Sequence, residues 1–384
     1  MKFETAQQTA ERLGVTVRAV QKWAKDGKLK GAHKAGRDWL IPVTDSQANL
    51  QDNPSGNIFP LMCLEYTHNS AKESLSALDG DERRIALGEY LYFTGDLLGA
   101  IEILSPYLES SNPIYRLSAA VFLAFSNLCH ERVNSVHGYA QHINKDFEFI
   151  YNSNFSKENI ARGVLAANTL KIQLHLPVGD VPAIDGYLKY LSNGGRLIAL
   201  YLAAYNSYLH GDYSRCLGIA ETAINCYKSE YAIPMIYLNI MCAVSLMNLM
   251  QVDKAKQHIE KAWAFAEKDG FIMPFVEHYS ILGGALDAVL KKSFPSDYGK
   301  IISAVKEYNV GWCEIYNQKS DSKMAANLTP IEFTVAMLYS RGWRAKEIAA
   351  HMELSERTIM NYIQVIYEKL HINGRKALKN FMLK

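Results

Sequence analysis

The sequence predicts a mostly α-helical protein, with a short helical module at each end and a long array of helix pairs between them. Apolar residues recur at helical spacing through most of the 384 residues. A helix pair near each end repeats the same spacing of a small and a β-branched residue. Residues 1–44 hold nine Lys and Arg against four Asp and Glu, residues 324–384 hold nine against five, and the remainder is acidic. Two basic ends favour contact with a polyanion.

The composition favours a cytoplasmic protein without a bound cofactor or metal. Hydrophobic residues make up 49% of the chain, no secretory signal is visible, and no apolar run reaches the roughly 20 residues that span a bilayer. No Cys-x-x-Cys pair occurs, so we expect free thiols that pack as small apolar residues, and the group Cys129, His130, His137 and His142 matches no zinc spacing. The six cysteines are Cys63, Cys129, Cys216, Cys226, Cys242 and Cys313.

Two short helices are expected in the first module. Thr5–Leu13 places apolar residues on one face, Gly14 ends that helix, and Thr16 caps the next through its side-chain oxygen. The second helix is expected to bury Val17, Val20 and Trp23. Its outward side chains are then Arg18, Ala19, Gln21, Lys22 and Lys25.

A β-hairpin with a basic tip is expected at His33–Pro42, directly after the helix pair. Together, residues 3–43 resemble the winged helix-turn-helix of the MerR and excisionase type. The resemblance implies that the second helix enters the major groove of DNA and that the wing reaches the backbone or the minor groove. The alternative is a helical hairpin that binds protein. The implied groove residues are Thr16, Arg18, Gln21 and Lys22, and the implied wing residues are Lys34 and Arg37.

A polar segment with Pro and Gly, residues 45–58, is expected to be a flexible linker. Residues 59–323 then form a helical domain with a weak internal repeat. In each copy a turn is followed by a small residue where two helices meet and by an apolar residue one helical turn later. The copies begin at Gly95-Asp96, Gly211-Asp212 and Met250-Gln251.

This repeat resembles the tetratricopeptide repeat, and the span has room for about six helix pairs. Such a stack buries one continuous core and exposes a concave face for partners. Trp263–Glu277 resembles a segment of MalT-like regulators, but the chain has no Gly-x-x-x-x-Gly-Lys-[Ser/Thr] loop, so nucleotide switching is not expected. The effector stays open between a small molecule and a protein partner, with dimerisation as a further role. Tyrosines that either line a ligand pocket or pack in the core are Tyr90, Tyr92, Tyr201, Tyr205 and Tyr208.

The last module contains the clearest helix signals. Thr329 is expected to cap a helix that has Pro330 at its first position and Glu332 completing a capping box. Residues 344–352 form a scaffold helix, and Leu354-Ser355 makes the turn and cap before the recognition helix 356–370. Ala349 and Ile359 stand ten residues apart, as Ala10 and Val20 do in the first module.

Residues 328–378 resemble the LuxR-type four-helix DNA-binding domain. The matching motifs are Leu328-Thr329-Pro330, Lys346-Glu347-Ile348-Ala349, Leu354-Ser355-Glu356, Thr358-Ile359, Asn361 and Lys369-Leu370. The resemblance implies a DNA surface that contains Ser355, with Arg357, Thr358, Met360 and Asn361 in the major groove and Lys346, Lys369 and Arg375 near phosphates. It also implies that the last helix pairs two copies. Met360 stands where the family usually has lysine, Tyr362 where it has histidine, and Gly374 where it often has asparagine.

These observations predict a sequence-specific DNA-binding transcriptional regulator of bacterial type that acts on double-stranded DNA as a homodimer. The predicted domains are residues 1–44, the linker 45–58, the helical domain 59–323 and the last module 324–384. No catalytic motif is visible, so we do not expect an enzyme. The alternative is a helical-repeat interaction scaffold whose terminal modules are accessory.

Overall fold

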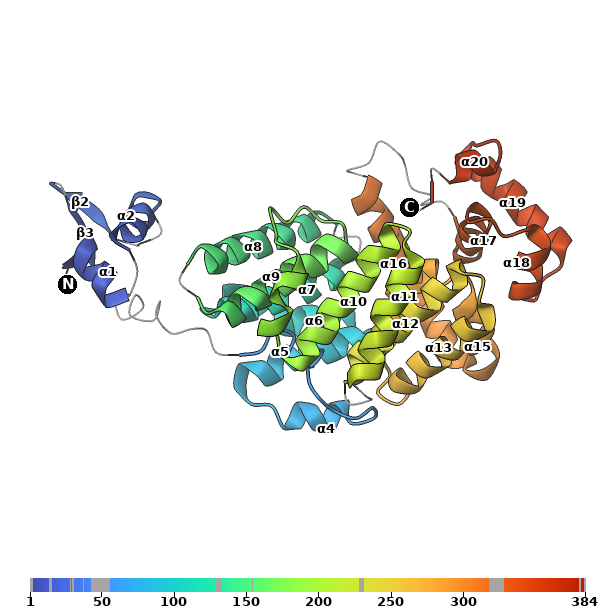
Figure 1. The fold of residues 1–384 in the computed structure, drawn as a ribbon, viewed down its shortest axis with the longest axis horizontal. Coiled ribbons are helices and arrows are strands. Elements are labelled where there is room, and N and C mark those ends of the chain that lie inside the picture. The colour runs from blue at the N-terminus through green and yellow to red at the C-terminus, as the bar shows by residue number, and fades with distance from the viewer. Residues whose placement is uncertain are drawn as a thin grey trace.

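The computed structural model describes residues 3–13, 16–27, 29, 31–36, 38–42, 56–128, 133–153, 155–227, 231–317, 328–379 and 381–382. This part of the chain is mostly helical, as predicted (Figure 1). Its buried apolar residues form two separate clusters. The smaller cluster belongs to the N-terminal module, residues 3–42. The larger runs from Ile58 to Met382, so the central array and the C-terminal module, residues 328–382, share one core. Residues 45–55 of the expected linker lie outside the described residues, whereas its last residue, Ile58, is buried in the larger cluster.

A three-stranded antiparallel sheet forms one side of the N-terminal module. Strand β3 (Asp38–Pro42) lies between β1 (Phe3–Thr5) and β2 (His33–Ala35). The predicted hairpin is confirmed, since Ala35 pairs with Asp38 at its tip. Strand β1 was not predicted, because three residues are too few for the alternation of a strand to be recognised.

The two helices of the N-terminal module, α1 (Ala6–Leu13) and α2 (Val17–Lys25), pack on each other and on β3. Ala10 and Val20 are buried in their shared core, as expected. Val17, however, was expected to be buried and is 38% exposed, while Ala24 is buried instead. Spacing identifies which residues share a face, but burial also requires a neighbour over each turn, and Val17 lies in the first turn of α2.

The central array consists of helices that pack mainly against their neighbours along the chain. Its first half contains α4 (Ala71–Ser76), α5 (Gly80–Thr94), α6 (Leu97–Leu104), η1 (Ser105–Glu109), α7 (Pro113–Leu128), α8 (Val133–Asn152), α9 (Lys157–Gln173) and η2 (Ile184–Tyr190). Its second half contains α10 (Asn193–Leu209), α11 (Tyr213–Tyr227), α12 (Ala232–Asn248), α13 (Val252–Ala266), α14 (Met273–His278), η3 (Tyr279–Ile281), α15 (Ala285–Ser293) and α16 (Pro295–Asn317).

The three predicted repeat turns share one backbone geometry. Gly95, Gly211 and Met250 all have positive φ, at 88°, 75° and 61°. The residue after each donates its amide to the carbonyl five residues earlier, at 2.8, 3.0 and 2.9 Å, which is the Schellman pattern of a helix end. The expected small residues at the helix contact are fully buried, and so are the apolar residues one turn on. They are Ala100 and Leu104, Cys216 and Ala220, and Ala255 and Ile259.

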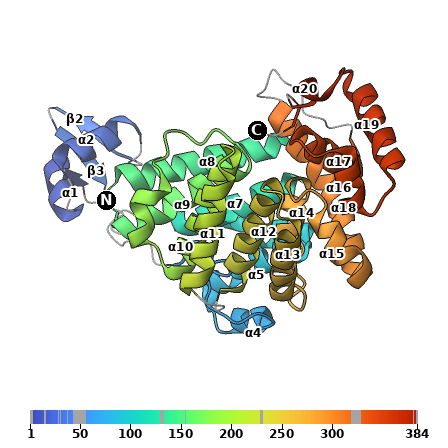
Figure 2. The same ribbon diagram turned by 45° about the vertical axis from the view of Figure 1, so that its right-hand side comes forward.

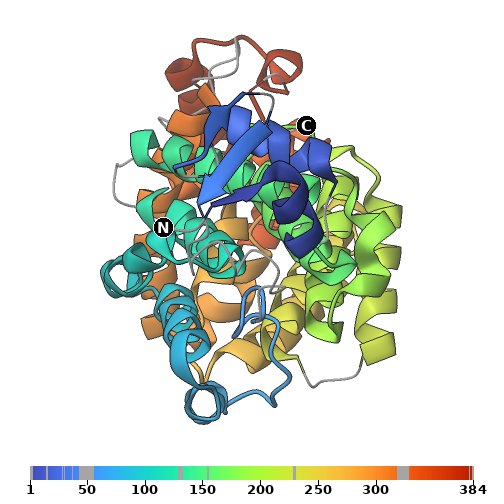
Figure 3. The ribbon, with the colours of Figure 1, turned by 90° about the vertical axis from the view of Figure 1, so that its left-hand side faces the viewer.

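The array curls back on itself, so that the segment between α13 and α14 meets its beginning. The carboxylate of Asp269 accepts the backbone amides of Asn69 and Ala71 at 2.8 and 3.2 Å, and the first of these pairs is 200 residues apart in the chain. The amide of Ile272 donates to the carbonyl of Phe93 at 2.8 Å. Figures 2 and 3 show the result, with the blue helices α4 and α5 beside the gold segment around α13 and α14.

Helix α14 fills the inside of this curl. Its Glu277 accepts the hydroxyls of Tyr92 at 2.6 Å and Tyr237 at 2.9 Å, and its His278 accepts the hydroxyl of Tyr201 at 2.9 Å. Burial raises the pKa of Glu277 to about 7 and lowers that of His278 to about 4. We expected an exposed concave face. Along α5, α10 and α12 it is instead covered by α14, because these polar and aromatic side chains satisfy one another there.

The five tyrosines singled out in the sequence pack mainly in the core. Tyr92, Tyr201, Tyr205 and Tyr208 are buried and Tyr90 is half-buried. No helix within the described residues has the length and apolar character needed to cross a membrane. In the same part of the chain, no three His, Cys, Asp or Glu side chains gather where they would hold a metal ion.

The C-terminal module contains α17 (Pro330–Ser340), α18 (Ala345–Met352), α19 (Glu356–Leu370) and the short α20 (Arg375–Leu378). The predicted capping box is confirmed. The Thr329 hydroxyl accepts the amide of Glu332 at 3.3 Å, and the Glu332 carboxylate accepts the amide of Thr329 at 2.7 Å. Gly342, with a φ of 113°, follows the end of α17. These signals are local, so the sequence alone was enough to predict them.

Candidate nucleic-acid interface

Helix α19 has one buried face and one exposed face. Its apolar residues Ile359, Ile363 and Ile366 are buried against the rest of the module. Ser355 caps the helix as predicted, because its hydroxyl accepts the amide of Thr358 at 3.0 Å. The cap and the buried face together fix the orientation of the exposed side chains, as a helix that docks into a groove requires.

The exposed face of α19 carries the predicted major-groove residues. Arg357, Met360 and Asn361 are exposed, and Met360 keeps half of its surface open to solvent. Thr358 is half-buried, and its hydroxyl lies 2.7 Å from that of Ser355. The face thus offers a guanidinium, an amide and a thioether, which suit the acceptors, donors and methyl groups of base edges.

Gln364 belongs to the same face but was missed in the sequence. It is exposed and lies seven residues after Arg357, which is two helical turns. Its amide donates to Glu368 at 3.0 Å. Helical spacing alone would have found it, since positions seven apart lie on one side of a helix.

The predicted phosphate-contact residues differ in their surroundings. Lys346, near the start of α18, is exposed. The ammonium of Lys369 instead lies 2.7 and 2.8 Å from the two carboxylate oxygens of Glu332. Burial would raise the pKa of Glu332, but Lys369 and Thr329 together hold it below its usual value. A phosphate would therefore have to share Lys369 with this carboxylate.

Arg375 is also engaged within the module. Its guanidinium donates to the carbonyls of Tyr339 and Trp343, the second at 2.8 Å, and lies 4.4 Å from the centre of the Tyr339 ring. It therefore ties the start of α20 to the end of α17. Its contact with phosphate, like that of Lys369, stays a prediction.

The N-terminal module presents a second exposed face on α2. Arg18, Gln21 and Lys22 are exposed, as is Thr16 just before the helix. Lys34 in β2 is exposed as well. Arg37, predicted for the tip of the wing, lies outside the described residues.

The two modules bury equivalent pairs of residues. In the first, Ala10 on α1 and Val20 on α2 are 3% and 0% exposed, and in the second Ala349 and Ile359 are 5% and 0% exposed. A small residue on the first helix lets the second approach closely, and a β-branched residue fills the space between them. The equal spacing seen in the sequence thus corresponds to the same kind of helix contact at both ends.

The C-terminal module is docked on the central array through α17 and α18, while α19 packs on α17 and α18. His351 of α18 hydrogen-bonds to the carbonyl of Gly283 at 2.7 Å, and Arg341 donates to the hydroxyl of Tyr208. Lys292 pairs with Glu353, in the turn between α18 and α19. These contacts leave the outer face of α19 exposed.

Comparison with known families agrees with this geometry. Residues 326–382 match the family described as "Bacterial regulatory proteins, luxR family", and residues 5–51 match a family described as "Helix-turn-helix domain". Each end of the chain carries a helix-turn-helix module. The two modules support a DNA-binding regulator. Comparison with curated proteins found no match, and comparison with solved structures found none either.

Proposed function

We propose that this protein is a sequence-specific, cytoplasmic transcriptional regulator in which α19 reads the major groove of double-stranded DNA. The observation that carries the proposal is the face of α19, where Arg357, Met360 and Asn361 are exposed opposite a buried apolar face. Contacts of Lys and Arg with phosphates supply most of the affinity for DNA, and a few side chains on base edges supply the sequence preference.

The N-terminal helix-turn-helix is assigned a second DNA contact. The side chains assigned to the major groove are Thr16, Arg18, Gln21 and Lys22. Lys34 and Arg37 of the wing are assigned to the backbone or the minor groove. The exposure of the described members of this set supports the assignment. Because the chain has a DNA-binding module at each end, we expect its DNA site to consist of two adjacent half-sites or of one site that both modules contact from opposite sides.

The central array is assigned the role of sensor, and its helices are assigned to tetratricopeptide-like repeats. The three equivalent turns at Gly95, Gly211 and Met250 support a repeated helix pair. The docking contacts at Tyr208 and Gly283 support transmission of a signal from the array to the C-terminal module. We further assign a homodimer formed through α20 that reads half-sites about one helical turn apart.

Selection of bound sequences from random DNA tests the proposal on the full chain. The wild-type protein should enrich a defined motif, and Arg357→Ala with Asn361→Ala should lose the part that α19 reads. Arg18→Ala with Lys22→Ala should lose a different part. An interaction scaffold, by contrast, would enrich no motif and would gain no preference over competitor DNA as the salt concentration rises.

A further inference from the structure

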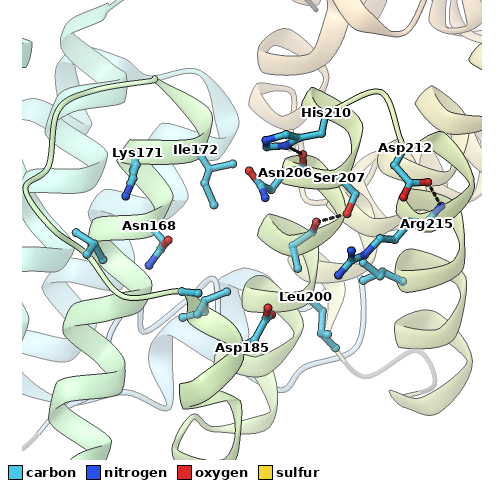
Figure 4. Close-up of a pocket in the computed structure, with 15 residues that line it drawn as sticks. Asn168, Lys171, Ile172, Asp185, Leu200, Asn206, Ser207, His210, Asp212 and Arg215 are labelled. Atoms are coloured by element: carbon cyan, nitrogen blue, oxygen red, sulfur yellow. Dashed lines mark hydrogen bonds between the residues drawn. The ribbon is translucent and has the colours of Figure 1, made fainter.

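A cavity of about 670 Å³ opens on one side of the central array. Its walls are α9, the segment 181–185, α10 and the first turns of α11 (Figure 4). This volume is in the range of small-molecule sites in proteins. The tyrosines considered from the sequence do not line it.

Two cations flank the cavity. Figure 4 shows Lys171 on the α9 side and Arg215 on the α11 side. Within the described part of the chain, neither the Lys171 ammonium nor the Arg215 guanidinium has a hydrogen-bond or ion-pair partner, although Asp212 accepts the backbone amide of Arg215 at 3.0 Å. Both side chains are exposed at the cavity and so are available to an anionic group of a ligand, although Asp185 and Asp212 line the same cavity. The guanidinium fork suits a carboxylate or a phosphate.

Hydrogen-bond acceptors line the rest of the cavity. The Asn168 amide nitrogen is occupied by the carbonyls of Val164 and Pro182, at 2.9 and 3.1 Å, so its oxygen is left for another donor. His210 is bonded through Nδ1 to the carbonyl of Asn206 at 2.8 Å, which makes Nε2 the acceptor in the neutral ring. With the Asp185 carboxylate, these acceptors suit hydroxyl or amino groups on the same ligand.

Helix α10 connects the cavity to the C-terminal module. Ser207 and His210 line the cavity. Tyr208, between them in the chain, accepts a hydrogen bond from Arg341, whose guanidinium lies 5.5 Å from the centre of the Tyr208 ring. The same end of α10 therefore faces the cavity on one side and the DNA-binding module on the other.

A second contact joins the cavity wall to the inside of the array. Gln173, two residues after Lys171 on α9, donates to the hydroxyl of Tyr201 on α10 at 2.5 Å, and that hydroxyl donates to His278. A ligand that bridges α9 and α10 would therefore act on both helices at a place where they are already hydrogen-bonded. A change in the distance between α9 and α10 would therefore also move Tyr208 on α10.

We propose that this cavity binds a small anionic metabolite that carries a carboxylate or a phosphate together with hydroxyl or amino groups. Binding changes the hydrogen bond that Arg341 donates to Tyr208, and so changes the DNA affinity of the C-terminal module. The binding site stands on its own geometry, whereas the effect on DNA affinity rests on the proposed function. A ligand changes an equilibrium only by its difference in affinity for the two arrangements, so occupancy and DNA binding must affect each other reciprocally.

Binding is tested on the full chain by calorimetry and thermal unfolding with two probes, glycerol 3-phosphate and malate, and with glycerol as the uncharged comparison. At least one charged probe should bind, and Lys171→Ala and Arg215→Ala should each weaken it at least tenfold. Lys254→Ala, which removes an exposed cation on α13, should leave the affinity unchanged. Preference for one probe distinguishes phosphate from carboxylate. If neither probe binds better than glycerol, or if the cavity variants bind as the wild type does, the proposal is wrong.

The link to DNA is tested by fluorescence anisotropy on a selected sequence, with and without the probe that binds. Tyr208→Phe keeps the ring but loses the hydroxyl, so it should bind the probe normally and show a reduced change in DNA affinity. A wild-type DNA affinity that does not respond to a bound probe would overturn the link. A chain that binds the probe but no DNA would refute the proposed function and leave the site intact.

Discussion

The Nε2 nitrogen of His351 donates to the carbonyl oxygen of Gly283 at 2.7 Å and so joins the scaffold helix of the C-terminal module to the turn before α15. The other ring nitrogen, Nδ1, is buried and has no partner in the part of the chain that the structure describes. Burial lowers the pKa of His351, although the Gly283 carbonyl opposes this. The burial of Nδ1 therefore favours the neutral ring, because a second proton on this nitrogen would find no acceptor.

The burial of the His351 ring should become less favourable in acid. The folded pKa lies below the ordinary value of 6.5, so the unfolded chain takes up the proton first as the pH falls. The stability contributed by neutral His351 is thus present above about pH 6.5 and is lost as the pH falls through the folded pKa. His351→Gln keeps a donor without titrating, so urea unfolding should show a smaller loss between pH 7.5 and 5.5 than in the wild type. An equal loss in both proteins would refute the assignment.

Arg357→Ala should reduce the affinity for the best DNA site by roughly 1–3 kcal/mol if Arg357 makes a bidentate contact with guanine. Competition experiments on single-base variants of the site measure where the preference is lost. A uniform loss on all sequences would show that Arg357 contacts phosphate only. Lys254→Ala is the matched control for the loss of one positive charge, because Lys254 is exposed on α13.

Met360 should read a thymine methyl group. Met360 is 50% exposed in the middle of the exposed face of α19. The thymine methyl is the main apolar group of the major groove, so it is the natural partner of this side chain. Replacing the contacted thymine with deoxyuridine removes one methyl, worth about 0.8 kcal/mol when buried. In Met360→Ala the thymine and deoxyuridine sites should bind almost equally. A methyl effect of the same size in both proteins would exclude this role.

Thr329→Ala should destabilise α17 by about 0.5–2 kcal/mol, since it removes one half of the capping box. Thr329→Ser keeps the hydroxyl and should stay close to the wild type. The free energy of unfolding in urea distinguishes the two. Because α17 carries part of the docking surface, the Ala variant should also expose Arg341 to faster proteolysis.

The repeat turns offer a matched pair of glycines. Gly95→Ala and Gly211→Ala both force a side chain into the left-handed region, which costs roughly 1–2 kcal/mol. At Gly211 an added Cβ meets nothing within 4 Å, whereas at Gly95 it would lie 2.9 Å from Cδ1 of Ile272. Gly95→Ala should therefore be the more destabilising in urea. The reverse order would mean that the contact with Ile272 relaxes without cost.

Local features of the fold were predictable from the sequence. The residues that form each of these features lie close together in the chain, within five positions for the repeat turns and seven for the hairpin. The features are the caps at Thr329 and Ser355, the hairpin β2–β3 and the three repeat turns. The buried pairs Ala10 with Val20 and Ala349 with Ile359 were predicted from the spacing of ten residues that they share. The exposed face of α19 was also predicted, because apolar residues at helical spacing mark the opposite face as the buried one.

Features that depend on distant parts of the chain were not predictable. Nothing near Glu277 in the sequence shows that two tyrosines from α5 and α12 surround it, so the closed interior was not expected. Lys369 and Arg375 looked like free cations, because their partners Glu332 and Tyr339 lie more than thirty positions away. Periodicity indicates which side of a helix is apolar and leaves open what covers it.

The contact of Asp269 with Asn69 and Ala71 has a consequence for synthesis of the chain. After Ala71 the ribosome must add 198 residues before the closing partner, Asp269, exists. Until then Tyr92 and Phe93 can pack on Phe122 of α7 but lack Phe271, whose ring centre lies 5.7 Å from that of Phe93. Long-range closure of this kind slows folding and exposes apolar surface to aggregation, so a chain that stops before α14 should depend on chaperones.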